Sequence, residues 1–364
     1  MKTKSNLVVS PRQGGAPMAR RALLAATAAV AFTGGSMAFA QAPIELKVSH
    51  YVPPGHTMHQ ELLRWAEDMD KKSNGRLKIS IFPASQMGPV TRQYDLARTG
   101  VADIAYFLHG ATPGRFPLTE LSQLPYAFNP EVGGVLQKPV SAAEASALLT
   151  GMTGQLAKEY EGTKLLLVIA QPNLSLMFNK AKVRQPSDMK GMRLRHNGPL
   201  AAKMIEALGA TPAAVAPVEL ADALEKGTVK GMVFNYEAAQ AFQMGGAVTS
   251  VTELNFNAVT LGLAMNEKKY ESLPADLRKL IDDSMGVEMA RRMGAKFDDA
   301  EAAGRRYLVE KKVEIIVPTA DEVKAFSKPL MPLVEQNVAS VQAKGLPARK
   351  FFDDFRARVN AVKP

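Results

Sequence analysis

The chain has no cysteine among its 364 residues, and it contains one tryptophan and five histidines. Without cysteine, disulfide scaffolds, Cys-ligated zinc or iron–sulfur sites and thiol nucleophiles are excluded. The first 40 residues contain no acidic residue but five of the 45 Lys and Arg side chains, so the remainder carries a scattered excess of only +5. Such an excess is too small for a phosphate-backbone footprint, and we expect no nucleic-acid partner.

Motifs for catalysis and metal binding are missing as well. The sequence has no G-x-S-x-G elbow, no P-loop and no G-x-G-x-x-G opening a helix. His50, His56 and His59 come nearest to a metal pattern, but no carboxylate at ligand spacing joins them. We therefore expect these histidines to have loop or capping roles, and we expect no metal, no cofactor and no enzymatic activity.

Residues 1–40 have the features of an export signal. Arg20-Arg21 precedes an uncharged run of about 11 residues, and Ala38-Phe39-Ala40 is the small-x-small pattern of a cleavage site. The run is much shorter than the ~20 residues that a membrane-spanning helix needs. We expect the leader to be removed and the mature chain to start at Gln41 in the periplasm, with the Sec and twin-arginine routes both open.

The first part of the mature chain has the pattern of an α/β fold. Apolar residues alternate with polar ones in three segments, and helical spacing separates these segments. The predicted strands are 44–48, 77–81 and 103–107, and the predicted helices run from Met58 to about Gly75 and over 94–99. Strand, helix, strand, helix, strand is typical of a parallel sheet with covering helices.

A second unit of the same kind follows a continuous apolar strand at 163–171, which is typical of a strand buried on both faces. Its predicted strands are 192–195, 212–215 and 229–234, and its predicted helices are 199–208 and 218–226. Two units indicate two lobes. The predicted organisation is a signal peptide at 1–40, lobe I at 41–170, lobe II at 171–256, and 257–364 contributing to both lobes.

The stretch between Pro274 and Pro318 contains no proline and keeps an imperfect apolar stripe. It predicts one long helix of about 38 residues, which at 1.5 Å per residue would reach roughly 57 Å. Such a helix is longer than either lobe, so we expect it to brace both of them.

Arg195 is the clearest candidate for ligand binding. It ends a predicted strand, and His196-Asn197-Gly198-Pro199 then turns into a helix. In open α/β sheets ligands bind outside the carboxyl ends of the strands, and a guanidinium beside free helix amides favours a carboxylate. The alternative interpretation is a surface arginine that closes a strand.

The same rule of strand ends adds further candidates. They are Phe234, Asn235 and Tyr236 after the next strand, His50 and Tyr51 after the first, Phe107 and His109 after the third, and Asn197 beside Arg195. For Phe234 and Asn235 the alternative interpretation is a core phenylalanine followed by an Asn N-cap.

An ordered set of motifs covers the whole mature chain. They are Ser49-His50-Tyr51-Val52-Pro53-Pro54-Gly55-His56, Asn74-Gly75-Arg76-Leu77, Ser85-Gln86-Met87-Gly88, Arg98-Thr99-Gly100-Val101-Ala102-Asp103-Ile104, Pro113-Gly114-Arg115-Phe116-Pro117-Leu118, Leu124-Pro125-Tyr126, Asp188-Met189-Lys190-Gly191-Met192-Arg193-Leu194-Arg195 and Glu225-Lys226-Gly227-Thr228-Val229-Lys230-Gly231. In this order the motifs resemble those of the DctP-type TRAP-transporter solute-binding proteins.

The resemblance implies a two-lobed periplasmic binding protein fold that closes on an organic acid. It also implies membrane permease subunits as partners, and we expect the binding protein itself to be a monomer. The carboxylate-clamping arginine of the family falls on Arg195.

Three departures from the family pattern bear on the ligand. Sialic-acid-binding members of the family have a second arginine where this chain has Ser175 and an asparagine where it has Phe234, so Ser175 is also a candidate ligand-binding residue. Lys230 replaces the usual aspartate of Val-Asp-Gly. The loss of one arginine and the gain of an aromatic ring favour a monocarboxylate, either an aromatic acid or a 2-oxo or 2-hydroxy acid. A C4-dicarboxylate is the alternative ligand, and an exported α/β enzyme is a weaker alternative function.

Overall fold

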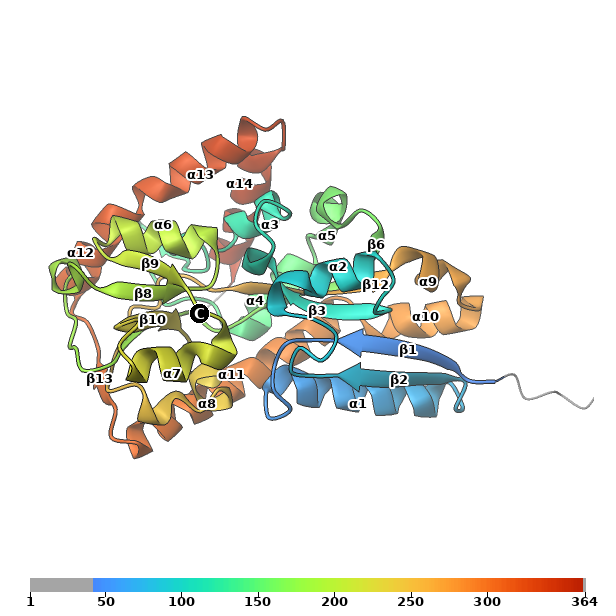
Figure 1. Ribbon diagram of the computed structural model, residues 1–364. Coiled ribbons are helices and arrows are strands. Elements are labelled where there is room, and N and C mark those ends of the chain that lie inside the picture. The colour runs from blue at the N-terminus through green and yellow to red at the C-terminus, as the bar shows by residue number, and fades with distance from the viewer. Residues whose placement is uncertain (1–41, 363–364) are drawn as a thin grey trace, which may run out of the picture. The chain divides into compact units, whose positions relative to one another are not determined.

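Two β-sheets organise residues 42–362, the part of the chain that the computed structural model describes (Figure 1). The predicted signal peptide at 1–40 lies outside these residues. The first sheet contains β1 (Ile44–Ser49), β2 (Leu77–Phe82), β3 (Ile104–Leu108), β6 (Thr163–Ala170) and β12 (Thr260–Asn266). The second sheet contains β7 (Ser175–Phe178), β8 (Arg193–His196), β9 (Thr211–Ala214), β10 (Gly231–Phe234), β11 (Ser250–Thr252) and β13 (Glu314–Ile316). A separate hairpin consists of β4 (Glu131–Val132) and β5 (Val135–Leu136).

The helices that follow and cover these strands have the following bounds. They are α1 (Thr57–Lys72), α2 (Gln93–Arg98), α3 (Pro117–Leu121), α4 (Ala142–Thr150), α5 (Thr153–Leu156), α6 (Pro199–Ala207), α7 (Leu220–Glu225), α8 (Tyr236–Ala241), α9 (Glu267–Ser272), α10 (Ala275–Ser284), α11 (Val287–Glu310), α12 (Ala320–Leu330), α13 (Pro332–Gln342) and α14 (Ala348–Ala361). None of these described helices has the length and apolarity needed to cross a bilayer.

The first sheet has the strand order β2-β1-β3-β12-β6. β1 pairs in parallel with β2 and β3, as predicted, whereas β12 runs antiparallel to β3 and β6. Leu46 and Val48 of β1 are fully buried, and so are Trp65 and Met69 of α1. The apolar residues that define the predicted strand and helix are therefore core residues of this lobe.

The second sheet has the strand order β13-β11-β7-β10-β8-β9. β8 pairs in parallel with β9 and β10, which confirms the second predicted unit, and β7 runs antiparallel to β10. The carboxyl ends of β8 and β10 consequently meet at one edge of the sheet. Arg195 and Phe234 lie at these ends.

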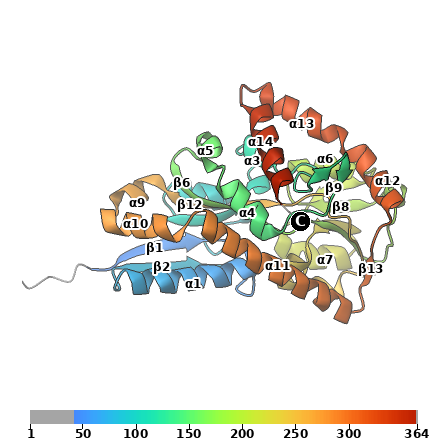
Figure 2. The same ribbon diagram turned by 180° about the vertical axis from the view of Figure 1, so that it is seen from behind.

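The single helix predicted between Pro274 and Pro318 is wrong in its length. The structure divides the segment into α10 and α11, because Met285 is extended and Gly286 has a φ of 93°, which no right-handed helix accommodates. α11 has 24 residues, about 36 Å of helix at 1.5 Å per residue. It still reaches both lobes, since it packs against α4 beside the first sheet (Figure 2) and against α8 beside the second (Figure 1).

α11 contacts one helix of each lobe through a carboxylate and a glycine. Asp298 accepts hydrogen bonds from the first backbone amides of α4, at 2.8 and 3.0 Å, and Glu301 accepts from those of α8, at 3.0 and 2.8 Å. Burial raises the pKa of Glu301 to about 8. Gly294 and Gly304 lie against the backbones of the same two helices. The long helix therefore caps a helix N-terminus in each lobe.

Candidate functional site

A small cavity lies between the two sheets. The first-sheet side contributes Tyr51, His56 and Leu108, and the second-sheet side contributes Arg195, Phe234 and Asn235. The connections that cross between the sheets contribute Gln171, Leu174 and Val259. Since side chains of both sides enclose it, this cavity is the candidate site.

Arg195 is the one arginine or lysine in the lining of this cavity. Its side chain is only 4% exposed, so the alternative of a surface arginine is wrong. Its Nε donates to the carbonyl oxygen of Val215 at 3.2 Å, and its Cζ lies 5.4 Å from the ring centroid of Phe234. These two contacts orient the guanidinium. Among the described residues they use only one of its five N–H donors, so the other donors are available to a ligand.

The charge of Arg195 has no counter-ion within the described part of the chain. Burial lowers the pKa of Arg195 to about 10, and the one charge effect on it comes from the Tyr51 hydroxyl rather than from an acidic residue. At neutral pH the guanidinium is therefore still a cation. Burying an unpaired charge is costly, and an anion entering the cavity would remove that cost.

Asn235 presents a side-chain amide to the cavity. It occupies the N-cap position of α8, as the alternative interpretation proposed, but its side chain makes no capping hydrogen bond, because Glu301 accepts the amides of Tyr236 and Glu237 instead. The Asn235 side chain is 1% exposed, and neither Oδ1 nor Nδ2 has a partner among residues 42–362. Its amide is thus available to a ligand.

Tyr51 and Asn197 complete the predicted residues that line the cavity. The ring of Tyr51 stacks on Tyr106, with centroids 6.0 Å apart and the planes 6° from parallel, and burial raises the pKa of Tyr51. The Tyr51 hydroxyl therefore stays protonated and can donate a hydrogen bond. Apart from the polar residues His56 and Gln171, the rest of the wall is apolar, namely Leu108, Leu174, Pro217, Phe234, Ala238, Phe242 and Val259.

Three predicted residues of the first lobe lie away from the cavity. His50 hydrogen-bonds through Nε2 to His59 Nδ1 at 2.9 Å, and Phe107 packs its ring on Gly262 of β12. His109 is buried and contacts Thr260 and Tyr160, with Nε2 2.7 Å from the Tyr160 hydroxyl. Successive strand residues point to opposite faces, so the cavity receives Leu108 rather than Phe107.

Two predicted residues of the second lobe also lie elsewhere. The Tyr236 hydroxyl donates to Glu253 at 2.8 Å, and Ser175 is buried in β7, paired with Phe234 of β10. Their neighbours in sequence, Asn235 and Leu174, line the cavity instead.

Several residues that line the cavity were not predicted, above all His56 and Gln171. His56 had been considered only as a capping residue or a metal ligand, and it does cap α1, because its Nδ1 accepts from the Met58 amide at 3.1 Å. Gln171 directly follows β6, so the rule of strand ends could have found it.

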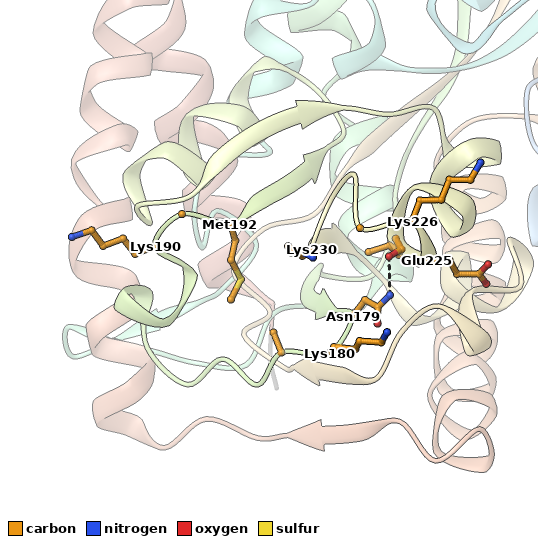
Figure 3. A pocket seen from close by; sticks show the side chains of 11 residues that line it. Asn179, Lys180, Lys190, Met192, Glu225, Lys226 and Lys230 are labelled. Atoms are coloured by element: carbon orange, nitrogen blue, oxygen red, sulfur yellow. Dashed lines mark hydrogen bonds between the residues drawn. The ribbon is translucent and has the colours of Figure 1, made fainter.

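A larger hollow, with about 1000 Å³ of empty volume, opens at the opposite ends of β8 and β10. It is lined by the turns that precede β8 and β10, and these turns carry Lys190, Lys226 and Lys230. Figure 3 shows Lys190 and Lys226 pointing away from each other and out of the hollow. Because these cations do not converge, we do not take this hollow as the candidate site.

Two α/β lobes with a cavity between them form the architecture of a solute-binding protein. Residues 48–340 match the bacterial extracellular solute-binding proteins, family 7 (DctP), and the chain belongs to this family. It is a TRAP-transporter solute-binding protein, and the family is one of transport proteins rather than of enzymes.

Three relatives illustrate the similarity. A TRAP solute-binding protein from Rhodoferax ferrireducens T118, solved with copurified benzoate, is 26% identical with a TM-score of 0.80, over 87% of this chain and 97% of that chain. A marine metagenome TRAP protein specific for aromatic acid ligands, solved with 3-hydroxybenzoate, is 25% identical with a TM-score of 0.82, over 89% of this chain and 100% of that chain. The C4-dicarboxylate-binding periplasmic protein DctP of Rhodobacter capsulatus is 25% identical, over 85% of this chain and 90% of that protein.

Proposed function

We propose that this chain is the periplasmic receptor of a TRAP importer for an organic monocarboxylate, either an aromatic acid or a 2-oxo or 2-hydroxy acid. Arg195 clamps the carboxylate, and the loaded protein, a monomer, delivers the acid to membrane permease subunits. Lobe I spans 41–170 and lobe II 171–256, and the segment 257–364 contributes to both lobes. Periplasmic location follows from the expected export signal and agrees with the extracytoplasmic family.

The observation that carries this proposal is the buried guanidinium of Arg195 without a counter-ion in the described residues. A carboxylate matches the paired donors of a guanidinium and neutralises its charge. Among the other donors around the cavity, Tyr51, Gln171, Asn197 and Asn235 are uncharged at neutral pH, and burial lowers the pKa of His56, which favours its neutral ring. One cation supports one carboxylate, which favours a monocarboxylate over a C4-dicarboxylate.

The apolar wall supports an acid with a hydrophobic body. Phe234 and Phe242 line the cavity together with Leu108, Leu174 and Val259. An aromatic ring gains most from burial against such surfaces. Relatives solved with benzoate and with 3-hydroxybenzoate have the same fold, which agrees with this assignment.

A panel of acids tests the proposal directly. We expect benzoate, 3-hydroxybenzoate, phenylacetate or mandelate to raise the melting temperature of the purified mature protein more than succinate does. An acid at 100 times its Kd adds about 2.7 kcal/mol to the free energy of unfolding, because only the folded protein binds it. Stabilisation by succinate alone would favour the dicarboxylate alternative, and stabilisation by none of the acids would refute the proposed function.

The contact between the two lobes predicts how binding depends on closure. Gly198, after β8, lies against the backbone of Gly110, after β3, and a Cβ at Gly198 would come 2.9 Å from Gly110 Cα and O. The backbone of Gly198 is extended, with φ 164°, so alanine adopts it without strain. We therefore expect Gly198→Ala to weaken ligand binding about tenfold, because overpacking disfavours the closed form.

Calorimetry and small-angle scattering would measure this effect. The radius of gyration of the wild type should decrease on saturation with the best acid of the panel. The decrease should be smaller in Gly198→Ala. The control is Gly246→Ala, since a Cβ there has no atom within 4 Å. Unchanged affinity and compaction in Gly198→Ala would show that closure does not need this contact.

A further inference from the structure

His56 presents an imidazole ring to the cavity from the N-terminus of α1. The side chain is 2% exposed, and its ring packs edge-on against Phe242 and Phe297, with centroids 6.3 and 5.9 Å away. These contacts and the capping bond to Met58 hold the ring in one orientation. His56 is therefore a fixed group of the cavity wall.

The capping bond determines where the ring carries its proton. Because Nδ1 accepts from the Met58 amide, it has no proton in this arrangement, and the N–H lies on Nε2. Burial lowers the pKa of His56, which favours this neutral ring, although Glu237 opposes the effect. If the ring were charged instead, Nδ1–H would face Glu237 Oε1 at 3.5 Å and Nε2 would still carry a proton. Both states make Nε2 a donor.

No residue of the described chain accepts a hydrogen bond from Nε2 of His56, while Nδ1 has its partner. The same cavity contains the unpartnered amide of Asn235. A donor that stays unpaired after the lobes exclude water disfavours the complex, because it loses its hydrogen bond to water and gains none in return. A ligand that places an oxygen against it removes this cost, whereas a ligand with only hydrogen or carbon there does not.

We propose that His56 is a specificity-determining residue whose Nε2–H donates to a second oxygen of the ligand, beyond the carboxylate. The ligand class is then hydroxy or oxo acids rather than their deoxy analogues. This inference rests on the proposed function, since it assumes that Arg195 holds the carboxylate in the same cavity. A hydroxyl also donates, and the Asn235 amide oxygen is a free acceptor in the same cavity.

The test uses two matched ligand pairs, mandelate with phenylacetate and 3-hydroxybenzoate with benzoate, and the variant His56→Asn. Asparagine is a preferred N-cap, so it keeps an acceptor for the Met58 amide but has no donor at the position of Nε2. In at least one pair we expect the wild type to bind the hydroxylated acid about tenfold more tightly. His56→Asn should lose this preference and change the affinity for the deoxy acid less than twofold.

His59→Asn is the matched control, because His59 lies on the same helix and hydrogen-bonds to His50 rather than lining the cavity. It should keep the preference of the wild type. Equal losses for both members of a pair in His56→Asn would indicate a structural role and overturn the inference, as would an unchanged preference. If the wild type binds none of the four acids, the proposed function itself fails. If it binds them without preferring the hydroxylated member of either pair, only the inference about His56 fails.

Discussion

Replacing Arg195 with alanine should weaken binding of the preferred acid by roughly 30- to 5,000-fold, or about 2–5 kcal/mol. The variant leaves the ligand carboxylate buried in the closed cavity without its cation. The loss should be large because Arg195 is the one arginine or lysine of the cavity lining.

Arg195→Lys should recover little of this affinity. The hydrogen bond from Nε to Val215 and the contact with Phe234 hold a planar group that has further N–H donors for a carboxylate. A lysine ammonium has no planar fork and is more strongly hydrated, so its transfer into the cavity costs more. The two variants together separate the geometry of the clamp from its charge.

Calorimetry with the best acid of the panel would measure both variants, and circular dichroism would show that they fold. Arg193→Ala is the matched control, because Arg193 begins the same strand but is exposed. It should bind like the wild type. Near-native affinity in a folded Arg195→Ala variant would contradict the clamp and the residue assignments that depend on it.

The prediction of the fold succeeded where local periodicity decides structure. Both strand–helix–strand units have the expected order, and Arg195 lies at a strand end as expected. The rule of strand ends gave five residues that line the cavity, namely Tyr51, Arg195, Asn197, Phe234 and Asn235. At the end of β3 it selected Phe107 and His109, whereas Leu108 lines the cavity, because successive side chains of a strand point to opposite faces.

Other features depended on contacts between distant segments. The alternative interpretation of Asn235 was a capping residue of α8, but Glu301, 66 residues later, takes the amides that Asn235 would have bound. Likewise, the lack of proline between 274 and 318 suggested one helix, although the backbone turns at Gly286. In both cases tertiary structure overrides a valid local preference.

The second large effect concerns stability, and it should appear in Gly304→Ala. In open space within a helix, alanine is about 1 kcal/mol more favourable than glycine. At Gly304, however, a Cβ would lie 2.1 Å from the carbonyl oxygen of Tyr236 and 2.4 Å from its carbonyl carbon. Backbone atoms cannot rotate away, so α11 would have to withdraw from α8. We expect the free energy of unfolding to fall by about 1–3 kcal/mol, the usual cost of overpacking.

Urea denaturation would measure the loss, and two glycines serve for comparison. Gly294→Ala should lose similar stability, since its Cβ would meet the Ala142 carbonyl oxygen at 2.3 Å, but it acts on α4, away from the cavity. Gly154→Ala in α5, with open space around the added Cβ, should not destabilise the protein.

Ligand affinity distinguishes the two crossing points of α11. Withdrawal of α11 at Gly304 also withdraws Glu301 from the N-terminus of α8, and the freed amides then compete for the side chain of Asn235. Gly304→Ala should therefore weaken acid binding as well as stability, whereas Gly294→Ala should affect stability alone. Wild-type stability in Gly304→Ala would show that α11 does not pack closely against α8 at this point. Glu301 would then not be the reason why the side-chain amide of Asn235 is unpaired.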